Sequence, residues 1–354
     1  MSLEQLACRR IRELTPYQSA RRIGGKGRIY LNANESPEGF DFTLSASSLN
    51  RYPDCQPEVL ISAYAAYAGV PRERILAGRG SDEIIGLLCR AFCEPGQEKI
   101  LICPPTYGMY AIAAETNGIG VVRIPPLADG QPDADRILPA VDQEKVKIIF
   151  LCSPNNPTGT LLDREILQRI LRETAGRALV VVDEAYIEFA PDHTSISLLD
   201  QFPHLVVTRT MSKAFGLAGL RCGFALGDPE VISVLLKVID PYPVCTPVAQ
   251  IAAAALSGQG IGIMRDRVAR LNTIRDKFAD ACRTIPCVRE VFASHGNYVL
   301  LRFTDGARIF SAAREAGYIL RDFGDKPGLG DCVRITVGTE AEMAEILAFL
   351  RRQS

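Results

Sequence analysis

The sequence lacks the features that mark nucleic-acid-binding and membrane proteins. It carries 40 Lys and Arg against 41 Asp and Glu, so no strong net field would gather nucleic acid or an acidic membrane surface. No stretch approaches the roughly 18 uninterrupted apolar residues of a membrane-spanning helix. No apolar run of signal-peptide length follows the start. We therefore expect a cytoplasmic protein with no nucleic-acid partner and no membrane.

The cysteines also lack a functional spacing. None of the 11 forms a CxxC pair of the kind that marks a zinc or redox site. Cys89 and Cys93 lie four residues apart on an expected helix, where one of them faces the core. Because free cysteines pack as small hydrophobic residues, the pattern favours reduced, structural cysteines and no bound metal.

Strands and helices alternate between residues 75 and 225. The run Ala178–Val182 is apolar throughout, which is typical of a strand covered on both faces. Asp163 can cap a following helix that has one apolar stripe. The order predicts an α/β domain with a mainly parallel sheet between helices. The expected strands are Lys99–Cys103, Gly120–Ile124, Val146–Cys152, Ala178–Val182 and Leu205–Thr208.

A second region begins near Pro241, where PYPVCTP interrupts this pattern. A chain of 354 residues suits two domains, or one large domain with an attachment. We assign residues 29–245 to a large α/β domain, and residues 1–28 with 246–354 to a small α+β domain that the N-terminal segment packs against. Its expected elements are a long helix at 262–284, strands at 298–303 and 333–337, and helices at 307–316 and 340–352.

Three short polar motifs directly follow expected strands. They are SPNNPTG (Ser153–Gly159), DEAY (Asp183–Tyr186) and TMSKAFGLAGLRCG (Thr210–Gly223). Ligands of open α/β sheets bind beyond the carboxyl ends of the strands. From Asn156 to Asp183 there are 27 residues and from there to Lys213 there are 30, which fits one strand–helix repeat each. We therefore expect the motifs to converge on one site.

The side chains of these motifs suit a pyridine cofactor that carries an aldehyde. Lys213 lies in a turn of small and polar residues, where partial desolvation lets a lysine lose its proton and attack an aldehyde. Asp183 follows an apolar strand, so its carboxylate needs a buried cation such as a protonated pyridine nitrogen. Asn156 and Tyr186 supply donors for a phenolate oxygen. The set predicts pyridoxal 5′-phosphate (PLP) bound covalently to Lys213.

A phosphate cradle is predicted beside these residues. AGRGSDE leads into an apolar helix, and the free N–H groups of a helix start favour an anion. Arg221 offers a bidentate grip on a phosphate, and hydroxyl groups lie nearby. The expected phosphate ligands are Gly80, Ser81, Asp82, Thr210, Ser212 and Arg221.

Each motif alone has a simpler interpretation. A lysine after a strand is usually solvated, NPTG is a plain turn signal, and DEAY can be a loop with a helix cap. Tyr107, in PPTYG, is placed to stack on a flat ring, although a buried tyrosine is more often part of the core. The functional interpretation depends on all the features occurring in one order at strand–helix spacing.

With these motifs the chain resembles the class II members of the fold-type I PLP-dependent aminotransferases. NPTG, SKAFGLAGLR and RITVGT specify only that superfamily. The combination of PYQSARR, LNANE, RYPDCQP and TYGMY points to the histidinol-phosphate aminotransferases of the enterobacterial kind. The likeness covers nearly the whole chain.

The resemblance implies a role for each matching residue. Lys213 would form the Schiff base with PLP and serve as the acid and base of the proton shift. Asp183 would pair with the pyridine nitrogen, Asn156 and Tyr186 would bind the phenolic oxygen, and Tyr107 would stack on the ring. The residues around the phosphate would be Ser81, Asp82, Thr210, Ser212 and Arg221, together with Tyr52 from a neighbouring subunit. The resemblance thus implies a homodimer with shared active sites.

The same resemblance implies the substrates. L-histidinol phosphate and 2-oxoglutarate would be interconverted with imidazole-acetol phosphate and L-glutamate, in histidine biosynthesis. Histidinol phosphate has no carboxylate and glutamate has two, so a site that serves both needs reusable guanidinium groups. Arg334, in VRITVGT, matches the residue that grips an acidic substrate group, and Arg321 and Tyr17 resemble contacts to the substrate phosphate.

Three other functions stay open at this point. A PLP-dependent decarboxylase of a phosphorylated amino acid would share Lys213 and the phosphate-binding arginines. An aromatic amino acid aminotransferase would use the same pocket for a flat ring, but its substrates carry no phosphate. A PLP-sensing regulator needs a fused DNA-binding module, for which the chain has no spare length.

Overall fold

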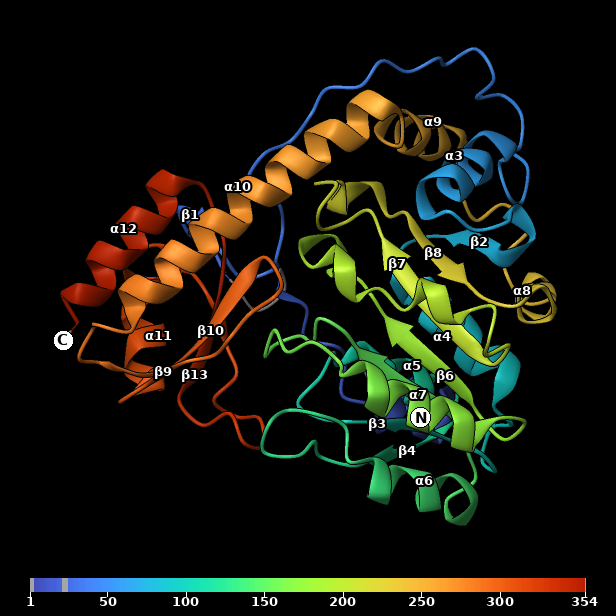
Figure 1. Cartoon of the computed structure of the whole chain (residues 1–354), viewed down its shortest axis with the longest axis horizontal. Helices are drawn as coiled ribbons and strands as arrows, with labels where there is room; N and C mark the ends of the chain where they lie inside the picture. Colours follow the sequence, from blue (N-terminus) through green and yellow to red (C-terminus); the bar gives the residue numbers. More distant parts are fainter. Residues whose placement is uncertain (1–2, 21–24, 354) are drawn as a thin grey trace.

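The computed structural model describes residues 3–20 and 25–353, and a seven-stranded sheet lies at its centre (Figure 1). Its strands are β2 (Ile75–Gly78), β3 (Lys99–Ile102), β4 (Gly120–Arg123), β5 (Val146–Cys152), β6 (Leu179–Asp183), β7 (Leu205–Thr210) and β8 (Gly223–Leu226). Their order is β2-β8-β7-β6-β5-β3-β4. Strands β3 to β7 pair in parallel, and only β8 runs antiparallel to its neighbours. The mainly parallel sheet predicted from the sequence is confirmed.

Helices cover both faces of this sheet (Figure 1). Successive side chains of β6 point to opposite faces. Val180 and Val182 pack in one hydrophobic core with α6 and α7, whereas Val181 packs in another with α4 and α5. The strand is apolar throughout because both faces are buried. The helices are α3 (Glu58–Ala68), α4 (Ser81–Phe92), α5 (Met109–Thr116), α6 (Ala134–Gln143), α7 (Arg164–Thr174), α8 (Pro229–Leu236) and α9 (Thr246–Ala255).

A smaller antiparallel sheet lies at the other end of the long helix α10 (Gly258–Cys282), which runs diagonally across Figure 1. Two helices, α11 (Gly306–Glu315) and α12 (Glu340–Arg351), pack with it. Its strand order is β12-β13-β10-β9. The strands are β9 (Val288–Val291), β10 (Tyr298–Phe303), β12 (Arg321–Asp322) and β13 (Cys332–Thr336).

Two helix starts show how local sequence sets the boundaries. The side chain of Asp163 accepts hydrogen bonds from the backbone of Glu165 and Ile166, so the predicted cap of α7 is confirmed. Helix α10 begins at Gly258, earlier than the predicted residue 262, because the Ser257 side chain accepts from the backbone of Gly260 and caps it there.

The N-terminal segment contacts both units. Strand β1 (Ile29–Tyr30) pairs in parallel with β11 (Tyr318–Ile319) of the smaller unit. Upstream, α1 (Arg9–Arg12) packs against α5 of the large sheet. The division at residues 28/29 and 245/246 therefore stays a prediction. Short 3₁₀ helices complete the described chain at Leu3–Leu6, Arg72–Arg74, Ile187–Phe189, Pro191–His193, Ile196–Leu198 and Ala218–Leu220.

Three general features follow for the described residues. All eleven cysteines lie among them and are free thiols. Within residues 3–20 and 25–353 there is no group of three or more His, Cys, Asp and Glu side chains placed to hold a metal ion. In the same ranges no single helix is long and apolar enough to cross a membrane; only α9 and α10 meet that test as a pair, bent by 70°.

Candidate active site

The three motifs after β5, β6 and β7 meet in one cavity of about 480 Å³. They lie at the carboxyl ends of adjacent parallel strands, as the sequence predicts. A larger cavity of about 1050 Å³ adjoins it and shares Tyr17, Tyr107, Asn156, Tyr186 and Lys213. The predicted residues that line the smaller cavity are Tyr17, Ser81, Asp82, Tyr107, Asn156, Asp183, Tyr186, Thr210, Ser212, Lys213 and Arg221.

Lys213 points its amine into both cavities. Its Nζ donates a hydrogen bond to the carbonyl oxygen of Ala33 at 2.9 Å and lies 5.6 Å from the centre of the Tyr186 ring. Burial, followed by the positive charge of Arg334, lowers the pKa of Lys213 to about 8. The lowered pKa makes the neutral amine, the form that attacks an aldehyde, far more abundant near neutral pH than in an exposed lysine.

Asp183, at the end of β6, is a buried carboxylate held by hydrogen bonds alone. Tyr110 donates from its hydroxyl to Oδ2 at 2.6 Å, and Oδ1 accepts from the Thr208 hydroxyl at 3.0 Å and from the backbone N–H of Ala185 at 3.2 Å. Burial raises the pKa of Asp183 and these hydrogen bonds lower it. Among the described residues no cation forms an ion pair with it, so a protonated pyridine nitrogen fits as its missing partner.

Asn156 and Tyr186 lie on the neighbouring strand ends, as predicted for contacts to a ring oxygen. Nη1 of Arg334 donates to Oδ1 of Asn156, which leaves the amide nitrogen of Asn156 available as a donor. The Tyr186 hydroxyl accepts from Nδ2 of Asn34 at 3.0 Å and keeps its own proton to donate. Burial raises the pKa of Tyr186, so this proton is retained.

The residues of the predicted phosphate cradle lie close together where α4 meets β8. Gly80 precedes α4 with φ of 82°, and a Cβ there would lie 2.6 Å from Nη2 of Arg221. A Cβ on Gly223 would lie 2.4 Å from the backbone nitrogen of Ser81. Glycine at both positions lets the helix start, the guanidinium and the strand approach one another. Free N–H groups of the first turn and a guanidinium suit a phosphate.

Side chains complete the cradle. Arg221 reaches Oδ2 of Asp82 at 3.2 Å and Oγ of Ser212 at 3.4 Å, and the Thr210 hydroxyl donates to Ser212 at 2.9 Å. The other oxygen of Asp82 accepts from the Tyr107 hydroxyl at 2.9 Å. Because its carboxylate is already held, Asp82 would meet a phosphate through its backbone N–H.

Two arginines that form no ion pair with an acid among the described residues lie together at the larger cavity. Arg321 and Arg334 are register partners on β12 and β13, so their side chains lie next to each other. Both line the larger cavity with Lys213 and Tyr17. Arg334 is buried, yet its Nε has no hydrogen-bond partner among the described residues, and neither has Nη1 of Arg321. An anionic substrate group would satisfy both guanidinium groups.

The predicted residue Tyr52 lies apart from the cavities. Tyr52 is 80 % exposed and stacks on Tyr242, with ring centres 4.3 Å apart and 11° between the ring planes. It lines neither the smaller nor the larger cavity within a single chain. That Tyr52 serves a neighbouring subunit stays a prediction.

Sequence reasoning missed several supporting residues. Tyr110 follows Tyr107 by three residues in PPTYGMY and lies edge-on to its ring. Thr208 precedes Thr210 by two residues on β7, so the two share a face of the strand. That spacing could have found them. The LNANE segment (Leu31–Glu35) supplies the carbonyl that holds Lys213 and the amide that holds Tyr186. Its role needs the fold, because it is distant in sequence from both.

Comparison with known proteins identifies the family. The family model "Aminotransferase class I and II" matches residues 30–350. The chain belongs to this family. Histidinol-phosphate aminotransferase of Aeromonas hydrophila is 56% identical over 99% of this chain and 98% of its own length. The protein of the same name from Pectobacterium carotovorum is 54% identical over 99% and 98%. The likeness to this branch of the aminotransferases, expected from the sequence, is confirmed.

A solved structure extends the comparison to the fold. Histidinol-phosphate aminotransferase from Sinorhizobium meliloti, in complex with pyridoxal 5′-phosphate, superposes on this aminotransferase with a TM-score of 0.83. The two are 25% identical, and the match covers 98% of this chain and 96% of that one. The predicted fold type I architecture, a large mainly parallel sheet with a smaller antiparallel unit, is therefore confirmed.

Proposed function

We propose that this aminotransferase interconverts L-histidinol phosphate and 2-oxoglutarate with imidazole-acetol phosphate and L-glutamate, in histidine biosynthesis. The observation that carries the proposal is the pair of guanidinium groups, Arg321 and Arg334, which lines one cavity with Lys213 and forms no ion pair with an acid in the described part of the chain. The identity to relatives named for this reaction supports the same substrate.

The residues around the smaller cavity fit PLP as the cofactor. When bound, PLP supplies an aldehyde for the substrate nitrogen and a ring that withdraws electrons from the substrate's α-carbon. Asp183 would hold the proton on the ring nitrogen, because its carboxylate is buried and pairs with no cation among the residues that the structure describes. Asn156 and Tyr186 would donate to the ring oxygen, and Tyr107 would lie against the ring. The phosphate would be held by Gly80, Ser81, Asp82, Thr210, Ser212 and Arg221.

Lys213 would act twice. Its amine would hold the cofactor covalently in the resting enzyme and, when free, would move a proton at the substrate's α-carbon. A lysine with a pKa of about 8 suits both tasks, since it accepts and returns a proton near neutral pH. Its hydrogen bond to the Ala33 carbonyl gives the free amine a fixed position.

The arginine pair would let one site accept two different anions in turn. Histidinol phosphate presents a phosphate and no carboxylate, whereas glutamate presents two carboxylates. Arg334, fixed by Asn156 and the carbonyl of Asn32, would hold one anionic group close to the cofactor. Arg321, half-buried and hydrogen-bonded to the carbonyl of Gln18, would hold the more distant one with Tyr17.

We also propose that the enzyme works as a homodimer with shared sites, in the cytoplasm. The segment between β1 and α3 leaves Phe40, Leu44, Leu49 and Tyr52 exposed, which is the surface that a second copy would cover. Tyr52 would then reach the phosphate in the neighbouring subunit. The balanced charge, 40 basic against 41 acidic residues, offers nothing to nucleic acid or a membrane.

The proposal is tested by following both products. The PLP-loaded protein is incubated with L-histidinol phosphate and 2-oxoglutarate, and glutamate formation is measured. Parallel reactions with O-phosphothreonine, in which carbon dioxide is measured, and with phenylalanine separate a decarboxylase and an aromatic aminotransferase from the proposed activity. Glutamate formed fastest with histidinol phosphate supports the proposal. Carbon dioxide release from phosphothreonine, without glutamate formation, contradicts it.

A further inference from the structure

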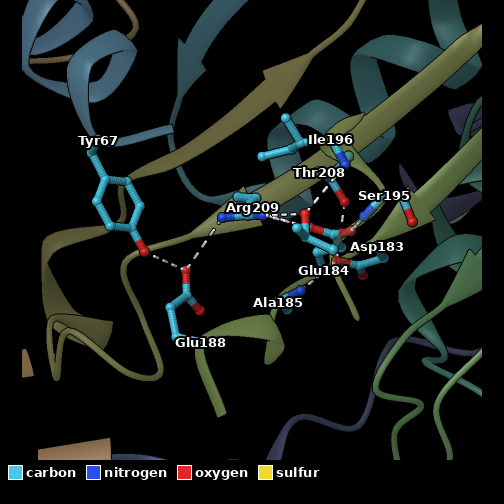
Figure 2. A network of polar contacts seen from close by, with 10 residues as sticks. Tyr67, Asp183, Glu184, Ala185, Glu188, Ser195, Ile196, Thr208 and Arg209 are labelled. Atoms are coloured by element: carbon cyan, nitrogen blue, oxygen red, sulfur yellow. Dashed lines mark hydrogen bonds and ion pairs between the residues drawn. The ribbon is translucent and has the colours of Figure 1, made fainter. Parts of the chain in front are cut away.

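A buried cluster of charged side chains lies directly behind the candidate site (Figure 2). Its members are Glu184, Glu188 and Arg209, whose side chains are 0%, 5% and 7% exposed. Two carboxylates share one guanidinium in a place where water does not screen them. None of the three lines either cavity, and the proposed function gives none of them a task.

The cluster alternates along the chain with residues that face the cavity. Glu184 directly follows Asp183, and Arg209 stands between Thr208 and Thr210. Asp183 and Thr208 are register partners on β6 and β7. Because successive side chains of a strand point to opposite faces, Glu184 and Arg209 lie on the face of the sheet that turns away from the cofactor cavity.

Two bridges therefore join the ends of β6 and β7, one on each face of the sheet. On the cavity face, Thr208 donates to Asp183 at 3.0 Å. On the other face, Arg209 donates to Oε2 of Glu184 from Nε at 2.9 Å and from Nη2 at 2.7 Å. The backbone N–H of Glu184 donates to the carbonyl of Thr208 at 2.9 Å between them. Neither strand end can shift without breaking the ion pair.

Neighbouring groups fix the ion pair further. The Thr194 hydroxyl donates to Oε2 of Glu184 at 3.0 Å and accepts from Nη2 of Arg209 at 2.7 Å. The backbone N–H of Ser195 donates to the other carboxylate oxygen. Glu184 thus has a partner for each oxygen, as a buried charge requires.

Glu188 is held more loosely. It lies 4.0 Å from Nη1 of Arg209 and accepts from the Tyr67 hydroxyl at 3.3 Å, while Oε2 has no partner among the described residues. Burial raises its pKa to about 7, against the attraction of Arg209. At neutral pH Glu188 is thus partly protonated, and the closely bonded pair in the cluster is Arg209 with Glu184.

We propose that Arg209 and Glu184 are positioning residues that fix Asp183 and Thr208 beneath the ring nitrogen of the cofactor. The inference rests on the proposed function, because it needs PLP in the cavity. A buried ion pair contributes little net stability compared with well-packed apolar side chains, so stability alone does not explain this one. The need for a fixed register of the two strand ends explains the ion pair, because Asp183 must meet the ring nitrogen within a fraction of an ångström.

The test uses Arg209→Met, Thr208→Val and the control Arg74→Met in the PLP-loaded protein. Arg74 is also largely buried, at 19% exposed, and pairs with Asp200 away from both cavities. The main readout is the pH at which the visible spectrum of bound PLP changes. Arg209→Met should shift this midpoint upward, because displacing Asp183 removes a proton, and with it a positive charge, from the ring nitrogen. Thr208→Val should shift it in the same direction.

Kinetics give a second readout. Arg209→Met should lower kcat by ~10- to 100-fold, as small misplacements near reacting groups do, with little change in the KM for glutamate. Arg209→Lys keeps the charge with a single nitrogen in place of two, and should recover part of the loss. Arg74→Met should lower the Tm but leave the midpoint and kcat unchanged.

Glu184→Gln provides a second test in case Arg209→Met does not fold. It keeps the shape of the side chain and removes its charge, and it should give the same upward shift in smaller measure. If Arg209→Met and Glu184→Gln lower the Tm but keep the midpoint and kcat of the wild type, the pair is only structural and the inference is overturned. A wild-type protein that binds no PLP would instead overturn the proposed function, and the inference with it.

Discussion

The hydroxyl of Tyr110 donates a hydrogen bond of 2.6 Å to Oδ2 of Asp183 at the centre of the candidate site. Both side chains are buried. Burial raises the pKa of Asp183, and the hydrogen bond from Tyr110 is the largest effect that lowers it. Tyr110, at the start of α5, thus helps to keep the Asp183 carboxylate ionised, and this carboxylate would face the cofactor's ring nitrogen.

Tyr110→Phe should therefore lower activity more than it lowers stability. The variant leaves Oδ2 of a buried carboxylate without its donor, at a cost of ~1–3 kcal/mol, and raises the pKa of Asp183 further. We expect kcat to fall ~10-fold, with weaker PLP binding, in steady-state rates and a PLP titration. Tyr318→Phe is the matched control, since the hydroxyl of that tyrosine also donates to a carboxylate, Glu345, at 2.8 Å in the smaller unit. Equal rate losses in the two variants would contradict this account.

Asp183→Asn should lose far more rate than cofactor affinity. The amide keeps the volume of the side chain but cannot stabilise a protonated ring nitrogen, so the ring no longer withdraws electrons. We expect kcat to fall ~100-fold or more, while the phosphate cradle and Tyr107 still hold PLP. Rates and PLP dissociation constants measured side by side check this. A variant with the wild-type kcat would rule out the assigned role of Asp183.

The stability of the cofactor-free enzyme should report the burial of Lys213. Its folded pKa of about 8 lies below the unfolded value of 10.5, so burying the charged form opposes folding. Between these values the unfolded chain binds more protons, and stability rises with pH. Lys213→Met should thus be the more stable protein at pH 7, by at most about 3 kcal/mol, and the difference should shrink as pH rises past 8. Denaturant unfolding at several pH values measures it, and a constant difference would contradict the lowered pKa.

Arg321 should matter most for the phosphorylated substrate. Arg321→Gln removes one guanidinium from a pair that has no acidic partner within residues 3–20 and 25–353, so we expect the KM for histidinol phosphate to rise ~10-fold or more. Inhibition by inorganic phosphate should weaken by a similar factor. Arg308→Gln, an exposed position on α11 bonded to Gln353, is the control and should change neither. If the KM stays unchanged in Arg321→Gln, the anion of the substrate is held elsewhere.

Shared sites can be tested by mixing inactive chains. In a hybrid of Tyr52→Phe and Lys213→Ala subunits, one site receives a native Lys213 from one chain and a native Tyr52 from the other. Refolding the two variants together should give more activity than the sum of the separate proteins. A mixture that only adds the two residual activities, in a preparation shown to contain hybrids, would place Tyr52 outside its partner's site.

Much of the site could be predicted from sequence because it follows the strand ends of a parallel sheet. Asn156, Asp183 and Lys213 each come after an apolar run, and the fold brings the carboxyl ends of neighbouring strands together. The glycine-rich start of α4 was predictable for a similar reason, since Gly80 and Gly223 permit approaches that a Cβ would block. These features are local in sequence or repeat with the strand–helix period.

Features that depend on distant contacts could not be predicted. Ala33 and Asn34 reach Lys213 and Tyr186 from a segment without regular structure, far away in the sequence. The antiparallel pairing of β8 with β2 and the parallel pairing of β1 with β11 also depend on tertiary contacts. The two strands of each pair are far apart in the sequence, so the strand–helix alternation does not predict them. The Arg209–Glu184 ion pair could not be predicted, because the sequence shows a charged residue within an apolar strand but not which residue neutralises it.

The central claim is that Lys213 and the arginine pair serve the amino group and the phosphate of histidinol phosphate. A single-turnover reaction tests it most directly. The PLP-loaded enzyme is mixed with L-histidinol phosphate in the absence of any 2-oxo acid, and the bound cofactor is analysed. The account predicts stoichiometric conversion of PLP to pyridoxamine phosphate, none in Lys213→Ala, and slower conversion with phenylalanine. Bound PLP that stays unchanged with histidinol phosphate, while phenylalanine or phosphothreonine consumes it, would contradict the account.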